Sequence, residues 1–413
     1  MALRFHGIAC RSCGSQDLAE VVDLGVQPPS NSFLAKDRLL GPEPHYTLVV
    51  LHCGGCGLVQ VPEVAAASEI FSDYLYFSSY SVSWLAHARR YVDAMTERFG
   101  LGPHSRVVEV ASNDGYLLQY FVQKGIPVLG IEPAANVAAA AREKGVETRV
   151  AFFTLELAKA LIADGMRADV IAGNNVLAHV PPINDFIAGL AHLLASDGVI
   201  TMEFPHLVRL VEEMQFDTIY HEHYSYYSLL VVERMFAAHG LRIFDVEQIP
   251  THGGSLRIYA CHNNARHAMT ASVERIKELE RDGGYDRRER YLEFGRKVYT
   301  LKRDLLEFLI GLKRANKSIA AYGAAAKGNT LLNFLGVGPD FIDFVVDRNV
   351  EKQGRYLPGS RIPILAPEAI AQRRPDYLVI LPWNLRDEIS EQMSGIREWG
   401  GKFVVLIPAP TVF

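Results

Sequence analysis

The sequence predicts an α/β protein with two doubly wound sheets and a small cysteine-bearing domain in front of them. Two blocks, roughly 100–262 and 315–413, alternate short apolar strands with helices, and this alternation is typical of parallel sheets. Four of the five cysteines lie ahead of both blocks, in two C-x-x-C pairs. A charged helical stretch separates the blocks, so the expected divisions are 1–98, 99–265, 266–314 and 315–413.

Length and composition exclude several classes of protein. The 413 residues suffice for two or three domains, and the 49% of apolar residues can build their cores. A formal net charge of −5 disfavours binding of nucleic acid through a basic surface. The start, MALRFHGIACRSC, lacks the apolar core of a secretory signal, and no apolar run reaches the ~18 residues of a membrane span. We therefore expect a cytoplasmic protein without a nucleic-acid or membrane partner, and leave the oligomeric state open, a monomer included.

The central block contains seven candidate strands. Five are separated by helices and should be parallel, whereas the last two are joined by a loop with His252 and should form an antiparallel hairpin at one edge. This arrangement is that of class I methyltransferases. The expected strands are Arg106–Val110, Val128–Ile131, Val146–Ala151, Asp169–Gly173, Val199–Phe204, Leu241–Val246 and Leu256–Cys261, and the expected helices include Gly115–Gln123 and Asn136–Lys144.

The charged stretch and the third block continue this pattern. The stretch breaks at Gly283-Gly284 and then carries apolar residues at spacings of 3 or 4, which predicts one buried helical face that packs on both neighbours. That face comprises Phe294, Val298, Leu301, Leu305 and Leu309. The third block is expected to be Rossmann-like, with strands Ser318–Tyr322, Phe341–Val346, Asp376–Leu381 and Lys402–Ile407.

Cysteine spacing predicts a metal site. Cys10 with Cys13, and Cys53 with Cys56, form two C-x-x-C-G units that can each direct two thiolates at one ion. The glycine after each unit permits a tight turn. Four thiolates leave no open position for a substrate, so we expect structural Zn²⁺ in an N-terminal zinc-binding domain. Four buried free cysteines are the alternative, and Cys261 is expected in the core.

The loop after the first central strand is the candidate cofactor site. Residues 107–115, VVEVASNDG, predict a strand, a turn of small residues and a helix start, above which backbone can approach a ligand. Ala111 and Asn113 stand where the usual fingerprint has glycines, so the motif is weak alone. Glu109 and Asp114 disfavour a pyrophosphate and suit the cationic S-adenosylmethionine. The candidate ligands in this loop are Glu109, Ala111, Asn113 and Gly115.

Later strand ends supply further candidates for the cofactor. Glu132 ends the second strand, where a carboxylate can accept hydrogen bonds from ribose hydroxyls, although a solvated loop acid is the alternative. Asn174 and Asn175 end the fourth strand, where the methionine part of the cofactor would lie. Phe152 and Phe153 follow the third strand and could flank adenine or belong to the core.

The densest cluster of ionisable side chains is YHEHY at 220–224. Carbon methylation beside a ketone needs a base for the α-proton and donors for the enolate oxygen, and histidine can be that base. In an extended segment His221 and His223 share one face and the other three residues share the opposite one; a turn would undo this division. A polar segment that caps the helix expected at Ser228–His239 is the alternative.

Two more segments are expected near the site. His179 follows the two asparagines of the fourth strand by a few residues and should open on the same cleft. The stretch 73–80 is rich in hydroxyl groups and includes Tyr74 and Tyr76, which could donate to a sugar oxygen, stack on a base or pack between domains.

Together these motifs resemble the sugar C-methyltransferases that act on nucleotide-diphosphate-linked 4-keto-deoxysugars. The resemblance covers nearly the whole chain and the combination is highly specific. It rests on the two knuckles and on QPPSNSFL (27–34), YLYFSSYSVSWLAHA (74–88), VVEVASNDGYLL (107–118), GIEP (130–133), FPHL (204–207), YHEHYSYYSL (220–229), THGGSLRIY (251–259) and YGAAAKGNTLLN (322–333).

The resemblance implies a zinc-binding domain, a central S-adenosylmethionine domain and a C-terminal Rossmann-like domain, with substrate between the last two. It implies deprotonation and methylation at C3 of the sugar, in deoxysugar biosynthesis, with His223 as the base. The groups that orient and polarise the ketone would be Tyr220, Glu222, His179 and Tyr74. Tyr76 and His252 would also contact the substrate. Loops without the usual glycines are normal in this family.

The third block then gains an expected role. Residues 322–329 form another strand, turn and helix start, which is not a P-loop because Asn329 follows Gly328. Helix N-terminal amides, Lys327 and Asn329 could hold the pyrophosphate of a nucleotide-sugar, or the sheet could serve packing alone. Asp347 after the next strand could bind a ribose or end a turn. The rival functions are an O- or N-methyltransferase, a zinc-ribbon RNA methyltransferase and a non-catalytic nucleotide-sugar-binding protein.

Overall fold

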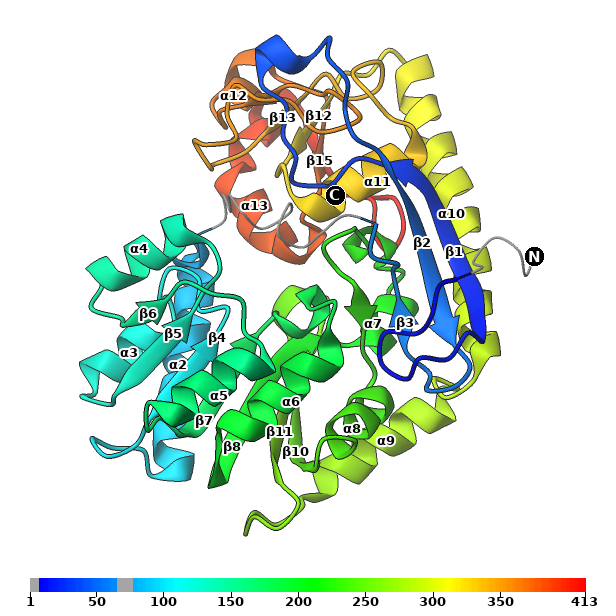
Figure 1. The fold of residues 1–413 in the computed structure, drawn as a ribbon. Helices are drawn as coiled ribbons and strands as arrows, with labels where there is room; N and C mark the ends of the chain where they lie inside the picture. Colours follow the sequence, from blue (N-terminus) through cyan, green and yellow to red (C-terminus); the bar gives the residue numbers. More distant parts are fainter. Residues whose placement is uncertain (1–6, 65–76) are drawn as a thin grey trace.

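The computed structural model describes residues 7–64 and 77–413, which form three sheets. A four-stranded sheet belongs mainly to the N-terminal part, a seven-stranded sheet to the central part and a six-stranded sheet to the C-terminal part. In Figure 1 the central sheet lies below the C-terminal one, and the long helix α10 runs along the N-terminal sheet. The expected α/β architecture is confirmed.

The N-terminal sheet is antiparallel and borrows one strand from the central part of the chain. Strand β3 pairs with β2 on one side and with β9 on the other, and β9 directly follows the YHEHY segment. The metal knuckles and the catalytic candidates therefore share one sheet, which sequence periodicity did not predict. The sheet order is β1-β2-β3-β9, with strands Leu18–Gln27, Tyr46–Cys53, Val59–Gln60 and Ser225–Tyr226.

The central sheet has the five parallel strands and the antiparallel edge hairpin that the sequence predicts, in the order β10-β11-β8-β7-β4-β5-β6. The edge strand β6 is shorter than expected, because it pairs with only two residues of β5. In chain order the strands are β4 (Val107–Val110), β5 (Val128–Ile131), β6 (Thr148–Arg149), β7 (Ala168–Asn174), β8 (Leu194–Pro205), β10 (Leu241–Ile249) and β11 (Ser255–His262).

Helices cover both faces of the central sheet. Buried side chains of α2 and α3 form one core with the sheet, and those of α5, α6 and α8 form another on the opposite face. The helices are α2 (Val82–Phe99), α3 (Leu118–Gln123), α4 (Ala135–Glu143), α5 (Leu155–Ala163), α6 (Ile183–Leu193), α7 (Leu207–Glu212) and α8 (Leu229–Ala237).

The connector consists of α9 (Ala271–Asp282) and α10 (Arg288–Arg314), with the break at the predicted glycine pair. The five apolar residues predicted to form one face of α10 are all buried. They share a core with strands β1 and β2 and with the C-terminal sheet, while α9 packs on the central part. A β-carbon at Gly295 would collide with the carbonyl oxygen of Val21, so glycine allows α10 to approach β1 this closely.

The C-terminal sheet contains the four predicted strands and two short edge strands that are too brief for a sequence pattern. Its order is β14-β13-β12-β15-β16-β17, so the chain switches direction at β12, as it does at β4 in the central sheet. Such switch points are where α/β sheets bind ligands. The elements are β12 (Ile319–Tyr322), α11 (Ala326–Leu335), β13 (Phe344–Val346), β14 (Ile364–Leu365), α12 (Ala369–Arg373), β15 (Tyr377–Ile380), α13 (Arg386–Gln392), β16 (Lys402–Val405) and β17 (Thr411–Val412).

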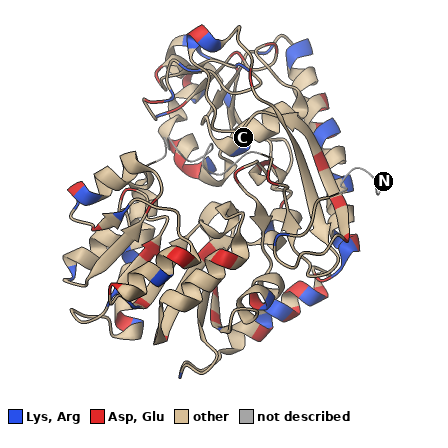
Figure 2. Cartoon of the chain, in the orientation of Figure 1, with Lys and Arg blue, Asp and Glu red and all other residues tan. Residues whose placement is uncertain are grey.

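Short 3-10 helices and surface charges complete the fold. Within the described residues, none of the helices is both long and apolar enough to cross a membrane. Basic and acidic segments are interspersed on the outer helices in the view of Figure 2. The 3-10 helices are η1 (Lys36–Arg38), η2 (Ser78–Tyr80), η3 (Leu177–His179), η4 (Phe216–Thr218), η5 (Thr251–Gly253), η6 (Trp383–Leu385) and η7 (Ser394–Trp399).

Candidate active site and zinc site

The four knuckle cysteines converge, and all four Sγ atoms lie within 4.8 Å of one another. The Sγ atoms of Cys10 and Cys56 are 3.5 Å apart and those of Cys13 and Cys53 are 3.6 Å apart. Zinc–sulfur bonds of ~2.3 Å in a tetrahedron place sulfurs ~3.8 Å apart, so the donor set fits Zn²⁺. The glycine after each knuckle has a positive φ, as the predicted tight turns require.

The loop after β4 has the backbone of a glycine-rich loop without its glycines. Ala111 and Asn113 adopt φ values of 56° and 49°, and Gly115 follows at 74°. Asparagine tolerates this left-handed region, whereas alanine pays ~1–2 kcal/mol for it. Strain of this kind at a candidate ligand site indicates that the loop shape is needed there.

Glu132 ties this loop to the end of β5. Its Oε2 accepts the backbone N–H of Asn113 at 3.0 Å, and its Oε1 accepts that of Ala134 at 2.9 Å. The side chain is buried, which raises its pKa. Each carboxylate oxygen can accept two hydrogen bonds, so one further acceptor position per oxygen is available for ribose hydroxyls.

A buried row of polar side chains lies on one face of the central sheet. Glu109 on β4 is fully buried, and burial raises its pKa well above the usual range. The amide of Asn174 on β7 is also buried, and the Tyr116 hydroxyl interacts with both Glu109 and Asn174. Neither acid nor amide belongs in an apolar core, so both are suited to face a polar ligand. The row therefore fits the methionine part of S-adenosylmethionine.

The same row continues in residues that sequence reasoning missed. Glu203 on β8 accepts hydrogen bonds from Arg257 on β11 at 2.7 Å and from His87 on α2 at 2.8 Å. Burial alone would raise the pKa of Glu203, but His87 and Arg257 together lower it. Trp84 stacks on His87 at 4.9 Å, so this network fixes the start of α2 over the sheet. The sequence did carry a signal for this network, because Glu203 and Arg257 are charged residues within two expected strands that are otherwise mostly apolar.

Two loops meet beside the end of β7. The side-chain amide of Asn175 lies 3.1 Å from Nε2 of His252, which brings η5 next to the loop of the cofactor site. Burial lowers the pKa of His252 to about 4, so its imidazole is neutral at pH 7. Phe152 is 47% exposed and available to a ligand, whereas Phe153 packs on Phe186 in the core.

The YHEHY segment is a turn, so the predicted alternation of faces is wrong. The backbone N–H of His223 donates to the carbonyl of Tyr220 at 2.9 Å and closes the turn. The two rings consequently stack with centroids 3.9 Å apart, and the Tyr220 hydroxyl lies 2.7 Å from Nε2 of His223. An extended segment would have placed these side chains on opposite faces.

The partners of His223 fix its tautomer. Nδ1 lies 2.8 Å from the carbonyl oxygen of Thr218 in η4. A carbonyl only accepts, so Nδ1 carries the proton and Nε2 presents its lone pair to the Tyr220 hydroxyl. Burial lowers the pKa of His223 well below its usual value. The imidazole is therefore neutral and has one basic nitrogen.

His179 joins the cofactor side to the YHEHY turn. It ends η3, which follows β7, and its ring lies 4.7 Å from that of His223. Burial lowers its pKa to about 4. The backbone N–H of Tyr224 donates to the carbonyl of Ala178 at 2.8 Å. The exit of β7 and the YHEHY turn therefore form one continuous surface.

Glu222 points away from the ring pair, towards the other two parts of the chain. Both of its oxygens accept from the side-chain amide of Asn31 at 2.9 Å. Burial raises the pKa of Glu222 to about 7, against the opposing effects of Asn31 and of Lys352 from the C-terminal part. Tyr74 and Tyr76, the other expected substrate contacts, lie outside the described residues.

The predicted C-terminal residues gather at the start of α11. Lys327 donates to Oδ1 of Asn384 at 2.7 Å and lies over the ring of Trp383. Asn329 is buried, and its side-chain amide has no hydrogen-bond partner in the described part of the chain. Asp347, which follows β13, accepts the backbone N–H of Ala324 at 2.8 Å. The arrangement supplies a cation and amide groups at one sheet edge.

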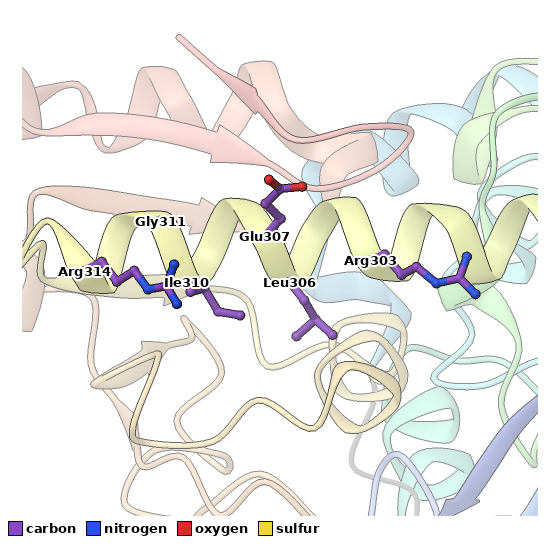
Figure 3. Close-up of a pocket in the computed structure, with 6 residues that line it drawn as sticks. All are labelled: Arg303, Leu306, Glu307, Ile310, Gly311 and Arg314. Atoms are coloured by element: carbon purple, nitrogen blue, oxygen red, sulfur yellow. The ribbon is translucent and has the colours of Figure 1, made fainter.

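Of two surface hollows, only the first adjoins a candidate site residue among those described: Trp383 and Asn384, which contact Lys327, help to line it. One lies between the start of α2 and the loop after β15, and it is lined by Ser83 and residues 383–388. The other follows the outer face of α10 (Figure 3) and contains none of the candidate site residues. It is lined by Arg303, Leu306, Glu307, Ile310, Gly311 and Arg314.

Comparison with known proteins assigns the family. Models of a zinc-binding domain, a methyltransferase domain and a C-methyltransferase C-terminal domain match residues 10–71, 84–246 and 250–408. The C-methyltransferase NovU of Streptomyces niveus is 38% identical over 403 residues, which cover 98% of this chain and 96% of that protein. The chain belongs to this C-methyltransferase family.

The C-methyltransferase is an enzyme that depends on S-adenosylmethionine and carries structural zinc. This assignment excludes two rival functions, methyl transfer to oxygen or nitrogen and non-catalytic binding of a nucleotide-sugar. The four thiolates fit the metal, and the row with Glu109, Asn174 and the loop acid Glu132 fits a cationic nucleoside.

Solved methyltransferase structures resemble this chain only weakly. The magnesium protoporphyrin IX methyltransferase of Synechocystis PCC 6803 with bound SAM is 16% identical and covers 49% of this chain and 100% of its own, with a TM-score of 0.36. The 1,6-didemethyltoxoflavin-N1-methyltransferase of Burkholderia thailandensis is 19% identical and covers 50% and 96%, with a TM-score of 0.35. Both scores are too low to indicate a substrate.

Proposed function

We propose that the C-methyltransferase methylates a nucleotide-diphosphate-linked 4-keto-deoxysugar at C3 through an enolate, as a step in deoxysugar biosynthesis. The observation that carries this proposal is the Tyr220–His223 pair, in which a neutral imidazole presents Nε2 to a phenol hydroxyl at 2.7 Å. Carbon next to a ketone can be methylated only after its proton is removed, and this pair combines a base with a donor.

The base is His223. Its Nδ1–H is held by the carbonyl of Thr218 at 2.8 Å, so Nε2 is the nitrogen that receives the α-proton. Burial keeps the pKa of the free imidazole low, and the positive charge that forms is shared with the Thr218 carbonyl. His179, 4.7 Å away between ring centroids, is also neutral and does not oppose this charge with one of its own.

The donor is Tyr220. Without substrate, its hydroxyl donates to Nε2 of His223. A keto oxygen bound beside the pair can accept that hydroxyl hydrogen, which polarises the carbonyl and frees the lone pair of Nε2 for the α-proton. The loop 111–115 and Glu132 would hold S-adenosylmethionine, whose S–CH3 bond would break as the enolate carbon takes the methyl group, with S-adenosylhomocysteine as the leaving group. His179 and Glu222 keep the turn in place from its two sides, and Tyr74 is proposed to orient the ketone.

The nucleotide end is assigned to the C-terminal part. Lys327 and the first amides of α11 supply positive charge for a pyrophosphate, and buried Asn329 in the first turn of α11 is proposed as a further donor. Asp347 is proposed as a ligand of the nucleoside. His252 and Tyr76 are proposed to contact the sugar from the central part.

The test is hydrogen exchange at the α-carbon. The purified enzyme is incubated in D₂O with a panel of nucleotide-4-keto-sugars, with and without S-adenosylmethionine, and product mass is followed. We expect one methyl group in the complete reaction and deuterium at C3 when the donor is omitted. His223→Asn should slow both by ~10²–10⁴-fold, the usual contribution of a general base.

A matched control is His104→Asn, which changes an exposed histidine at the start of the central part. It should leave both rates unchanged. Methyl transfer without any exchange in all arms, or undiminished exchange in His223→Asn, would contradict the proposed base. A lack of reaction with every sugar would contradict the substrate class.

A further inference from the structure

The ring of Trp383 connects the C-terminal part to the segment that holds His223. Trp383 begins η6, directly after β15, and its Nε1–H donates to Oδ2 of Asp217 in η4 at 2.8 Å. The ammonium of Lys327 lies 4.5 Å from the centre of the same ring. One side chain therefore contacts both the proposed pyrophosphate ligand and the central part of the chain.

Asp217 is an unusual residue to find at this contact. Its side chain is fully buried, and besides the indole N–H it interacts with the backbone N–H groups of Asp217 itself and of Thr218. Burial raises its pKa to about 6, while Lys327 and the indole N–H of Trp383 oppose this rise. Removing a carboxylate from water costs stability even when it is hydrogen-bonded, so a purely structural site would favour an apolar residue.

Three consecutive residues of η4 each contact a different neighbour. Phe216 packs edge-on against Phe334 of α11 with ring centroids 5.3 Å apart. Asp217 accepts from Trp383, and the carbonyl of Thr218 accepts the Nδ1–H of His223 at 2.8 Å. The position of η4 therefore sets the direction of the imidazole and is itself set by two elements of the C-terminal part.

Trp383 also supports the loop that carries His252. A β-carbon at Gly253 would collide with the outer edge of the Trp383 ring, so glycine permits this close packing. The side chain of Gln215, just before η4, donates to the carbonyl of Gly253 at 2.9 Å. The ring consequently touches the two segments of the central part that flank the proposed sugar position.

We propose that Trp383 and Asp217 are positioning residues. Their hydrogen bond holds η4 in a fixed position relative to the C-terminal part, and η4 in turn orients the imidazole of His223 towards a ligand bound by Lys327. This inference rests on the proposed function, because His223 is the base and Lys327 the pyrophosphate ligand only there. An anion at Lys327 draws positive charge away from the ring and from Asp217. Nucleotide binding therefore alters the surroundings of His223 through η4.

The test uses Trp383→Phe, which keeps an aromatic ring but removes the N–H that Asp217 accepts. Trp399→Phe is the matched control, because Trp399 donates its own N–H to the carbonyl of Pro375 elsewhere in the C-terminal part. Asp217→Asn is the conservative variant, since its amide oxygen can still accept from the indole. The imidazole resonance of His223, assigned by its loss in His223→Asn, is recorded with and without thymidine or uridine diphosphate.

We expect the nucleoside diphosphate to shift this resonance in the wild type, in Trp399→Phe and in Asp217→Asn, but not in Trp383→Phe. Loss of one hydrogen bond to a charged group should lower kcat for α-deuterium exchange in Trp383→Phe by ~10–100-fold, with KM changed much less. The affinity for S-adenosylhomocysteine should stay the same.

Each alternative outcome decides between the proposals. An equal shift in Trp383→Phe, an equal loss of kcat in Trp399→Phe, or no shift in the wild type overturns the positioning role. If the wild type exchanges no keto-sugar nucleotide, yet its His223 resonance responds to the diphosphate through Trp383 alone, the proposed function fails and the positioning role stands.

Discussion

In each of the two doubly wound sheets of this C-methyltransferase, one acidic side chain fixes the backbone of the loop that precedes it by accepting hydrogen bonds from backbone N–H groups. In the central sheet, Glu132 after the second strand accepts the N–H of Asn113 in the preceding loop and that of Ala134 two residues on. In the C-terminal sheet, Asp347 accepts the N–H of Ala324 in its loop and that of Asn349 two residues on. Both acids follow the strand next to the switch point of their sheet, since β5 lies beside β4 and β13 lies beside β12.

The side chains around the two acids differ in charge. Three buried carboxyl groups, those of Glu109, Asp114 and Glu132, surround the central loop, and one lysine, Lys144, pairs with Asp114 at 2.9 Å. The C-terminal loop has lysines: Lys327 at the start of α11 and Lys352, whose ammonium lies 3.9 Å from Asp347. The two loops share their backbone hydrogen bonds but differ in the charges around them. The acidic central loop is suited to a cationic nucleoside, and the C-terminal loop with its lysines is suited to an anionic nucleotide.

The first prediction tests whether the two acids serve different ligands. Glu132→Gln should weaken binding of S-adenosylhomocysteine by ~10–100-fold, because the carboxylate loses charge-assisted hydrogen bonds. Asp347→Asn should leave that affinity unchanged and should lower the affinity for a nucleoside diphosphate instead. Titration calorimetry with both ligands measures each effect.

Glu143→Gln, an exposed acid on α4, is the control for the first pair and should change neither affinity. If Glu132→Gln and Asp347→Asn lower the affinity for the same ligand, the assignment of a different ligand to each sheet is wrong.

The second prediction concerns the cation of the C-terminal site. Lys327→Met keeps the length of the side chain but removes the charge, so we expect nucleoside diphosphate to bind ~10-fold more weakly and with a smaller dependence on salt. Binding of S-adenosylhomocysteine should not change. Lys402→Met, on the exposed end of β16, is the matched control. Equal weakening of both ligands would show that Lys327 supports the fold and not the anion.

The architecture of the sheets was predictable because strands and helices leave local patterns. The five parallel central strands, the edge hairpin and the buried face of α10 all follow from periodicity and from the alternation of strands and helices. The candidate loop could be located although it lacks glycines, because its neighbours Glu132 and Asn174 end strands in the expected register. The left-handed backbone at Ala111 and Asn113 then explains why glycine is usual there.

Contacts between distant segments were not predictable from one sequence. His87, Glu203 and Arg257 are separated by 116 and 54 positions, and only the folded sheet brings them together. The turn at Tyr220 depends on one backbone hydrogen bond, which no side-chain period reveals. Trp383 and Asp217 likewise belong to different parts of the chain and meet only through packing.

The last prediction concerns Glu222, where the acidic and the basic regions meet. Its pKa in the folded protein is raised from 4.5 to about 7, so the folded state holds a proton that the unfolded state has lost. Because the buried histidines, whose pKa values are lowered, contribute the opposite slope, Glu222 is followed as a difference between variants: its own contribution to the free energy of unfolding should fall as pH rises from ~4.5 to ~7. Glu222→Gln stays neutral and can still accept from Asn31, so it should lose most of this dependence.

We expect Glu222→Gln to match the wild type near pH 4.5 and to exceed its stability at pH 8 by on the order of 1–3 kcal/mol. Thermal unfolding across this pH range measures the difference. Glu289→Gln, an exposed acid on α10, should keep the slope of the wild type. If Glu222→Gln also keeps that slope, Glu222 is ionised at neutral pH, and its charge is balanced by Lys352 across the boundary between the two sheets.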